Sequence, residues 1–284
     1  MLRLFKQTGT RWGNRRKGMY SIRERLSSMF SKIMAGTVSR EEGAMLINHL
    51  VRDNMNDTVR ELSYIMENPP QNVFPKTMLH TITLARNRAL FSILVSSLNH
   101  KDEEVAVLAA AELARLRTNE ARDVLRENLN SEAYHVRKAS AAALARELGD
   151  EGIEILKNHI LTHQEPFYRS TSAQGLLSAG RKGMEALLSI LSSGKPGVQS
   201  SVAEAISTAY GEGLQDTDIQ VAVDALMRAG DRKDTPSIVE LLKVIALFRK
   251  RAGSYGGYVE AFADYPSESV RKEVQKALSQ IRGG

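Results

Sequence analysis

The sequence predicts an all-α fold, a right-handed solenoid of stacked antiparallel helix pairs, from three observations. Apolar positions recur at steps of 31 residues, as at Val105, Val136, Phe167 and Val198. Segments of helical periodicity alternate with turns rich in Gly, Asn and Asp, and no run of alternating β-branched residues indicates a strand. A fixed period of this length is typical of repeats that stack along one axis and share an extended core. Two further series with the same step are Leu98, Leu129, Ile160 and Leu191, and Ala110, Ala141, Ser172 and Ala203.

The first 19 residues are predicted to form a flexible basic arm. Glycines interrupt any helical pattern in residues 1–19, and the many arginines favour solvent. Residues 1–40 carry ten Lys and Arg and a single acid, Glu24, which gives a net charge of +9, whereas the rest of the chain carries 29 basic and 32 acidic residues. The high isoelectric point of about 9.5 therefore belongs to the N-terminal region of a nearly neutral body.

Residues 20–71 are predicted to hold helices that cap the first repeat. Two of them begin at capping boxes, in which a serine side chain and a glutamate three residues later satisfy each other's backbone donors. These pairs are Ser21 with Glu24 and Ser39 with Glu42. We expect helices at 21–34, 39–51 and 57–67, the last stopped by two prolines.

Residues 72–284 are predicted to form the regular solenoid. One set of helices is expected at 74–86, 104–117, 134–148, 166–179, 197–210, 236–250 and 267–281. The partner set is expected at 88–98, 120–130, 151–162, 183–192, 217–229 and 257–263. No single helix pair can bury its apolar stripe alone, so each depends on its neighbours.

One helix of this region carries a recognisable pattern. Val136-Arg137 is followed by Ser140-Ala141 and Ala143-Leu144, and a looser copy has Val270-Arg271 with Ala277-Leu278. This pattern resembles the second-helix signature of HEAT repeats, which belong to the armadillo-type folds. The resemblance implies a solenoid whose second helices line a concave binding face. It implies little about function, because such repeats serve many unrelated roles.

Chemistry-bearing residues form no catalytic or metal-binding pattern. The chain has no cysteine, which excludes a disulfide framework and a thiol nucleophile. His159 and His163 are four residues apart but lack the glutamate of a metalloprotease motif, and we interpret them as polar helix positions. No His-Glu dipeptide occurs, which argues against the HEAT-repeat di-iron hydroxylases. The segment 194–197 lacks the glycine spacing of a phosphate loop and is interpreted as a turn. We therefore expect no cofactor, no metal and no enzymatic activity.

Three sets of residues are candidates for binding. On the predicted concave face, we expect a sparse basic ladder in which Lys138 and Arg169 occupy equivalent positions. An alternative is that Arg137 bonds to a neighbouring turn, as the family's arginine commonly does. The ladder consists of Arg137, Lys138, Arg169, Arg271 and Lys272. The arm contributes Arg15, Arg16 and Lys17. A predicted mobile loop contributes Arg249, Lys250, Arg251, Tyr255 and Tyr258.

These features predict a non-catalytic, cytoplasmic scaffold or adaptor that binds a partner protein on its concave face and an acidic partner or surface through its arm. One alternative is a nucleic-acid binder, because cations beside tyrosines can contact phosphates and stack on bases. A lower-ranked alternative is a HEAT-like bilin lyase. The Met and Phe stripe of helix 21–34 permits three roles: a cap on the first repeat, a docking helix, or peripheral contact of residues 1–34 with an anionic membrane. No stretch is apolar enough to predict a transmembrane helix.

Overall fold

The computed structural model describes residues 21–211 and 213–283. In this part of the chain, helices joined by short turns account for the whole fold and no strand is present, which confirms the predicted all-α solenoid of helix pairs. The chain separates into two compact units, one ending at Ile93 and the other beginning at Leu94. The sequence predicted a boundary between residues 71 and 72, where the regular repeat begins. That boundary stays a prediction.

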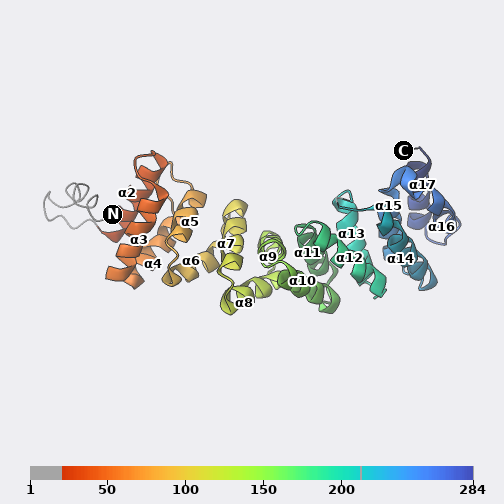
Figure 1. The fold of residues 1–284 in the computed structure, drawn as a ribbon, viewed down its shortest axis with the longest axis horizontal. Coiled ribbons are helices and arrows are strands. Elements are labelled where there is room, and N and C mark those ends of the chain that lie inside the picture. Colours follow the sequence, from red (N-terminus) through yellow and green to blue (C-terminus); the bar gives the residue numbers. More distant parts are fainter. Residues whose placement is uncertain (1–20, 212, 284) are drawn as a thin grey trace. The chain divides into compact units, whose positions relative to one another are not determined.

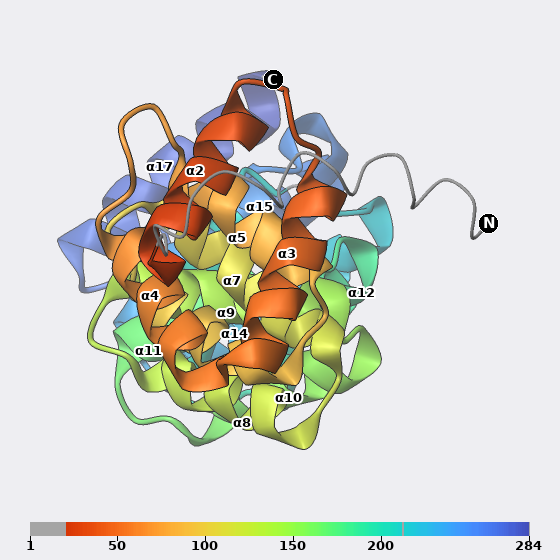
Figure 2. The ribbon, with the colours of Figure 1, turned by 90° about the vertical axis from the view of Figure 1, so that its left-hand side faces the viewer.

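In the residues that the structure describes, the first unit is built around four α-helices. They are α2 (Ile22–Met34), α3 (Arg40–Asp53), α4 (Met55–Glu67) and α5 (Pro75–Leu84), followed by the 3-10 helix η1 (Arg88–Leu90). Helix α2 packs on α3 and α4, and α3 packs on α5; Figure 2 shows these helices, coloured red to orange. Both predicted capping boxes, at the starts of α2 and α3, are present.

Helix α2 covers the first unit with its apolar stripe. Leu26, Met29 and Phe30 are buried against the neighbouring helices. At its polar side, Arg23 donates to Glu61 of α4 over 2.6 Å and lies 3.8 Å from the ring centre of Tyr64. These contacts favour the cap among the three roles weighed for this helix, because its apolar residues are already occupied.

The second unit consists of helix pairs that follow each other along the chain. Helix α6 (Phe91–Ser97) crosses the division between the units. The remaining elements are α7 (Glu103–Leu116), α8 (Asn119–Glu127), η2 (Asn128–Asn130), α9 (Tyr134–Glu147), α10 (Asp150–Thr162), α11 (Pro166–Leu177), α12 (Arg181–Ser193), α13 (Val198–Thr208), η3 (Asp216–Asp218), α14 (Ile219–Asp231), α15 (Thr235–Ala246), η4 (Arg249–Tyr255), α16 (Gly256–Glu260) and α17 (Glu268–Gly283).

The odd-numbered helices form one continuous row in this unit. Helix α7 packs on α9, α9 on α11, α11 on α13, α13 on α15, and α15 on α17. Figure 1 shows α9, α11, α13 and α15 in this order, from green to blue. Each also packs against an even-numbered helix on its other side. The exposed side of the row, from α7 to α17, is called the odd-helix face below.

The repeat keeps an average step of 31 residues but slips locally. Phe167 was expected at the buried position of Val136 and Val198, yet its side chain is 49% exposed, and Tyr168 takes that position instead. This slip of one residue arises in the helix that precedes α11. Helix α10 has 13 residues, whereas the corresponding α8 and η2 have nine and three, so α11 begins one residue later than a step of 31 predicts. The buried positions of α13 then match those of α11 at a step of 30, which restores the average.

Helices α9 and α11 approach each other closely because the residues between them are small. A Cβ atom placed on Gly175 of α11 would lie 2.5 Å from the Cβ of Ala141 and 3.0 Å from that residue's carbonyl carbon. Only glycine fits this contact, since small residues allow helices to pack at short distance. The Ala and Gly content of the repeat therefore determines how tightly the odd-numbered helices stack.

Candidate functional site

Polar side chains link successive helices along the odd-helix face. Arg115 of α7 donates two hydrogen bonds to the Glu147 carboxylate of α9, each of 3.0 Å. The hydroxyl of Tyr134 in α9 reaches Gln174 of α11 over 3.1 Å. Two further links are Ser170 to Glu204, at 2.8 Å, and Ser207 to Glu240, at 3.3 Å. The face is thus a connected polar surface that extends from α7 to α15.

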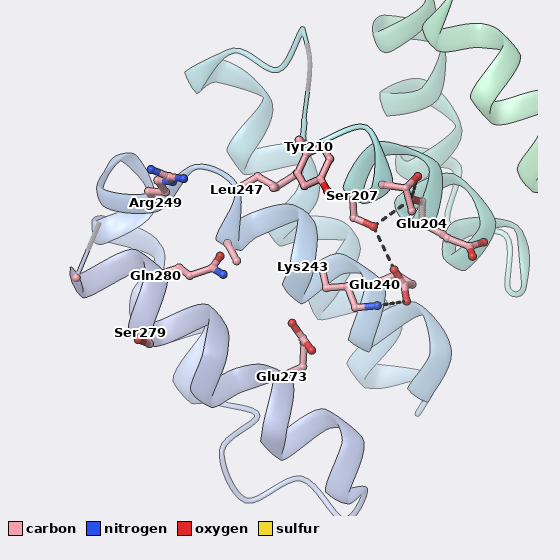
Figure 3. A pocket seen from close by; sticks show the side chains of 13 residues that line it. Glu204, Ser207, Tyr210, Glu240, Lys243, Leu247, Arg249, Glu273, Ser279 and Gln280 are labelled. Atoms are coloured by element: carbon pink, nitrogen blue, oxygen red, sulfur yellow. Dashed lines mark hydrogen bonds and ion pairs between the residues drawn. The ribbon is translucent and has the colours of Figure 1, made fainter.

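A groove opens on this face between α13, α15 and α17, and it is our candidate functional site. Its volume is about 890 Å³. Figure 3 shows the side chains of its walls, with α17 on one side and α13 and α15 on the other. The lining residues are Glu204, Ser207, Thr208, Tyr210, Glu240, Lys243, Ala246, Leu247, Arg249, Glu273, Ser279, Gln280 and Gly283.

Three glutamates, one from each helix, surround one end of the groove. Glu240 accepts from Lys243, its neighbour one turn away, over 2.6 Å. Glu273 of α17 faces these two residues across the groove (Figure 3) and pairs with Lys276 over 3.4 Å. The Glu204 carboxylate accepts a hydrogen bond from the neutral hydroxyl of Ser170, and the contacts described above include no cation for it. This end therefore carries three carboxylates and a single lining lysine, and we call it the acidic end.

The opposite end of the groove is basic. Arg249 is the first residue of η4, three residues after the last residue of α15, with its side chain exposed and its backbone in the left-handed region at φ 50°. Tyr210, which is 88% exposed, borders the same groove. Figure 3 shows Arg249 and Glu273 at different ends of the groove. A ligand lying along the groove would meet carboxylates at one end and a guanidinium at the other.

The structure places Arg137 in the interior and not on the surface. Its guanidinium donates to the backbone carbonyls of Ser131 and Glu132, over 2.6 and 2.9 Å, in the turn before α9. The guanidinium carbon also lies 5.0 and 4.9 Å from the ring centres of Phe167 and Tyr168. Arg137 holds the turn in place, as the family resemblance implied in the alternative interpretation.

Arg169 has the same role one repeat later, which corrects the predicted equivalence with Lys138. It is buried and donates to the carbonyls five and six residues before it, those of Gln164 and His163, as Arg137 does to its own turn. It also reaches Gly197, over 2.8 Å, before α13. Burial lowers the pKa of its guanidinium. The equivalent residues are Arg137 and Arg169, at a step of 32, and neither forms part of an exposed ladder.

The other three residues of the predicted ladder lie nearer the surface. Lys138 is exposed on α9. Arg271 is half-buried and donates to the carbonyls of Tyr265 and Pro266, over 2.7 and 2.8 Å, so that it copies the turn contact of Arg137. Lys272 is exposed and pairs with Glu268 one turn away. A continuous basic ladder is therefore not formed, which removes the main support for nucleic-acid binding on this face.

The predicted mobile loop at 249–258 is helical. Residues of the Gly-Ser-Tyr stretch lie in η4 and α16, and Ala252 and Val259 anchor them in the core. Arg251 pairs with Asp216 over 2.6 Å, Lys250 is exposed, and Arg249 lines the groove. The rings of Tyr255 and Tyr258 lie 6.4 Å apart. The glycines predicted mobility, but burial of Ala252 and Val259 holds this segment in a compact helical conformation.

The arm residues Arg15, Arg16 and Lys17 lie outside the described residues. Their predicted role in electrostatic attachment therefore stays a prediction that rests on charge alone.

His159 was interpreted as an ordinary polar position, but the structure gives it an interior role. Its two ring nitrogens lie 3.0 Å from Asn130 Oδ1 and 2.9 Å from Ser172 Oγ, so that it joins η2, α10 and α11. Desolvation by burial, and then the neighbouring His163, lower the pKa of His159 to about 4. The imidazole is consequently neutral at pH 7.

The groove carboxylates were not found from the sequence. Glu204, Glu240 and Glu273 follow each other at 36 and 33 residues, so the search for a step of 31 does not align them. They could have been found as the acidic positions that interrupt the apolar stripe of α13, α15 and α17. Among the described residues, no group of three or more His, Asp and Glu side chains is arranged to hold a metal ion. None of the helices described is both long and apolar enough to cross a membrane.

Stacked helix pairs with one exposed row of helices define a class, the α-helical repeat proteins. Residues 88–177 match the family model described as HEAT repeats. The segment from η1 to α11 therefore carries HEAT-type repeats, within a chain whose described residues form an all-α fold of helix pairs. HEAT repeats commonly act as protein-interaction scaffolds.

Comparisons with whole proteins add little to this assignment. No curated protein matches the sequence. Among solved structures, an engineered protein is 23% identical, with 68% of this chain and 96% of that chain covered and a TM-score of 0.37. Human deoxyhypusine hydroxylase, in complex with glycerol, is 14% identical, with 93% and 98% covered and a TM-score of 0.36. A designed armadillo repeat protein is 18% identical, with 67% and 99% covered and a TM-score of 0.35. At such TM-scores these likenesses carry no functional argument.

Proposed function

We propose that the protein is a non-catalytic scaffold or adaptor that binds a segment of a partner protein in the groove between α13, α15 and α17. The observation that carries this proposal is the groove itself, which is built from three successive helices of the exposed row. Rigid helices present its side chains, and extended surfaces of this kind are what solenoids use for binding. The cytoplasm, expected from a chain without cysteine, stays the predicted location.

The chemistry of the groove supports binding more than catalysis. Ser207 donates to Glu240 of the next helix, and Thr208 donates to backbone carbonyls of its own helix. Among the groove residues described above, no hydroxyl is bonded to a histidine that could activate it as a nucleophile. The proposed role needs only shape and charge from these residues, and we propose no reaction for them.

The arm is proposed to act separately from the groove. Residues 1–40 carry a net charge of +9, and such a charge attracts acidic surfaces over about 10 Å at ordinary salt concentrations. Replacement of Arg15, Arg16 and Lys17 by Gln is expected to weaken binding of the full chain to phosphatidylserine-containing vesicles and to reduce the salt dependence. Unchanged binding at low salt would remove the arm from the proposal.

The groove is tested by selecting peptides from a displayed random library on the immobilised full chain. We expect enrichment of related sequences that bind the unmodified protein. The Thr208→Trp variant is expected to lose them, because Thr208 lines the groove and a bulky ring there fills it. The variant's circular dichroism spectrum and unfolding midpoint show whether the fold is kept.

Ser192→Trp is the matched control. Ser192 of α12 and Thr208 of α13 are both exposed hydroxyl residues that donate to the carbonyl four residues earlier, over 3.1 and 2.9 Å. The two variants thus add the same ring in the same local setting, but only one adds it to the groove. The proposal fails if no sequence is enriched, or if both tryptophan variants retain the selected peptides equally.

A further inference from the structure

We infer that the groove recognises an extended partner segment with a basic side chain and, about four residues away, an acidic one. This inference rests on the proposed function and specifies its ligand. It follows from the distribution of charge along the groove, whose two ends differ in sign.

The acidic end is suited to a lysine or arginine side chain. Glu240 and Glu273 face each other across it (Figure 3), Glu204 lines the same groove and accepts from Ser170 of α11, and Lys243 is the single lysine of the lining. Lys243 already pairs with Glu240 over 2.6 Å. The Glu273 side chain is only 13% exposed, whereas that of its partner Lys276 is 68% exposed and 3.4 Å away. An arriving cation would therefore find carboxylate oxygens that are partly desolvated and incompletely neutralised, and such groups form the stronger charge-assisted hydrogen bonds.

The other end is suited to a carboxylate. Arg249 is exposed at the start of η4 and lines the groove. Its neighbour Arg251 is already paired with Asp216, whereas Arg249 presents a planar fork of donors that matches a carboxylate. The exposed ring of Tyr210 borders the groove and offers flat contact for an aliphatic side-chain stem.

The spacing of the two charges follows from helix geometry. Glu240 and Arg249 are nine residues apart in the chain, and between them α15 ends at Ala246 and a turn at residues 247–248 leads to Arg249, the first residue of η4. The six steps from Glu240 to Ala246 rise about 9 Å at about 1.5 Å per residue, and Arg249 lies beyond the end of α15 (Figure 3). An extended peptide advances about 3.3 Å per residue, so about three residues span the helical part and about four reach Arg249. A basic and an acidic residue at i and i+4 of an extended segment would therefore meet both ends.

The test uses fluorescein-labelled peptides with a Gly and Ser background and the full-length protein. One peptide carries Arg and Glu four residues apart, a second has Gln in place of Arg, and a third has Gln in place of Glu. Fluorescence anisotropy at low salt is expected to rank the first peptide tightest, by about fivefold for each charge, since one exposed ion pair contributes this much at its upper limit.

Variants of the protein assign each charge to its end of the groove. Glu240→Gln combined with Glu273→Gln is expected to weaken the peptides that carry Arg and to leave the Arg-free peptide unchanged. Arg249→Gln should do the reverse, affecting only the peptides that carry Glu. Asp224→Gln combined with Glu127→Gln is the control, because it changes the net charge equally at exposed positions of α14 and at the end of α8.

The outcomes separate this inference from the proposed function. Equal losses in the groove and control variants, or equal binding of all three peptides, would overturn the charge assignment. If Thr208→Trp still abolishes binding in that case, the groove keeps its proposed function; if it does not, both fail. Neutralising Arg15, Arg16 and Lys17 should leave peptide binding unchanged. Tighter binding would show that the chain's own arm competes for the groove, which would overturn the assignment to a partner.

Discussion

The turns before α9 and α11 and the groove between α13, α15 and α17 use charged residues in opposite ways. In the turns, Arg137 and Arg169 are buried and donate to backbone carbonyls of their own turns, and Arg169 also to one before α13. In the groove, the exposed Glu204 and the half-buried Glu240 and Glu273 bond to short or flexible side chains. The comparison teaches that a charged residue of this repeat is available to a ligand only where the turns of the backbone do not already use it.

Turns and helix faces use charged residues differently because they differ in the number of backbone groups that lack a hydrogen-bond partner. A turn between helices leaves carbonyls without helical partners, and a guanidinium with five donors can satisfy several of them together. The exposed face of a helix has no such need, because its backbone is bonded internally. Side chains there are free to contact a ligand.

The largest effect is expected from removing Arg169. Arg169→Met should lower the free energy of unfolding by about 4 kcal/mol, because the carbonyls of His163, Gln164 and Gly197 lose their donors in a partly buried turn. Urea unfolding of the full chain measures this. Lys138→Met, on the exposed side of α9, is the control and should change stability by less than about 0.5 kcal/mol. Equal losses of stability in the two variants would contradict the distinction between charged residues in the turns and charged residues on the exposed face.

A pH dependence is expected from His159. Its pKa is lowered to about 4 in the folded protein, from an ordinary value of 6.5. The neutral His159 imidazole contributes fully to the free energy of unfolding above pH 6.5. This contribution is lost as the pH falls towards 4, because in that range the unfolded chain binds a proton that the folded chain does not. The unmodified protein should lose about 3 kcal/mol more than His159→Gln between pH 7 and pH 4. Parallel pH profiles of the two proteins would show that the imidazole is not buried as described.

The close contact of α9 and α11 predicts an intermediate effect. Gly175→Ala places a methyl group 2.5 Å from the Cβ of Ala141, and should destabilise the chain by about 2 kcal/mol through overpacking. Gly257→Ala in α16 is the matched control, since its new methyl group has no atom within 4 Å. It should be neutral or slightly stabilising, because Ala favours a helix by about 1 kcal/mol over Gly. Thermal unfolding midpoints distinguish the two.

The smallest effect on stability is expected in the groove. Glu273→Gln should change the free energy of unfolding by less than about 0.5 kcal/mol, because its partner Lys276 is exposed and the pair is long. The same variant should weaken the binding of an arginine-bearing peptide. A large loss of stability in urea would mean that Glu273 supports the fold, as Arg169 does, and would break the comparison.

Much of the fold was predictable from the sequence. The helix pairs, the capping boxes at Ser21 and Ser39 and the average step of 31 residues all follow from local patterns of apolar, capping and turn residues. The local slip at Phe167 was not predictable in this way. It depends on the length of α10, which periodicity alone does not reveal.

The candidate site was less predictable than the fold. A search for basic residues selected Arg169, whose burial depends on the turn beside it, and passed over Glu240 and Glu273, whose role depends on three helices meeting. The sequence shows which side chains a helix carries but not which exposed charges converge from different helices. His159 was missed for a similar reason, since its partners Asn130 and Ser172 lie on other elements.

The central claim, that the groove of the odd-helix face binds a partner segment, is tested most directly by hydrogen exchange. The full chain is measured alone and saturated with a peptide selected on it. The account predicts slowed exchange in the C-terminal turns of α13, α15 and α17, with α8, α12 and α14 unchanged. Slowed exchange confined to the even-numbered helices, or to the first unit, would contradict it.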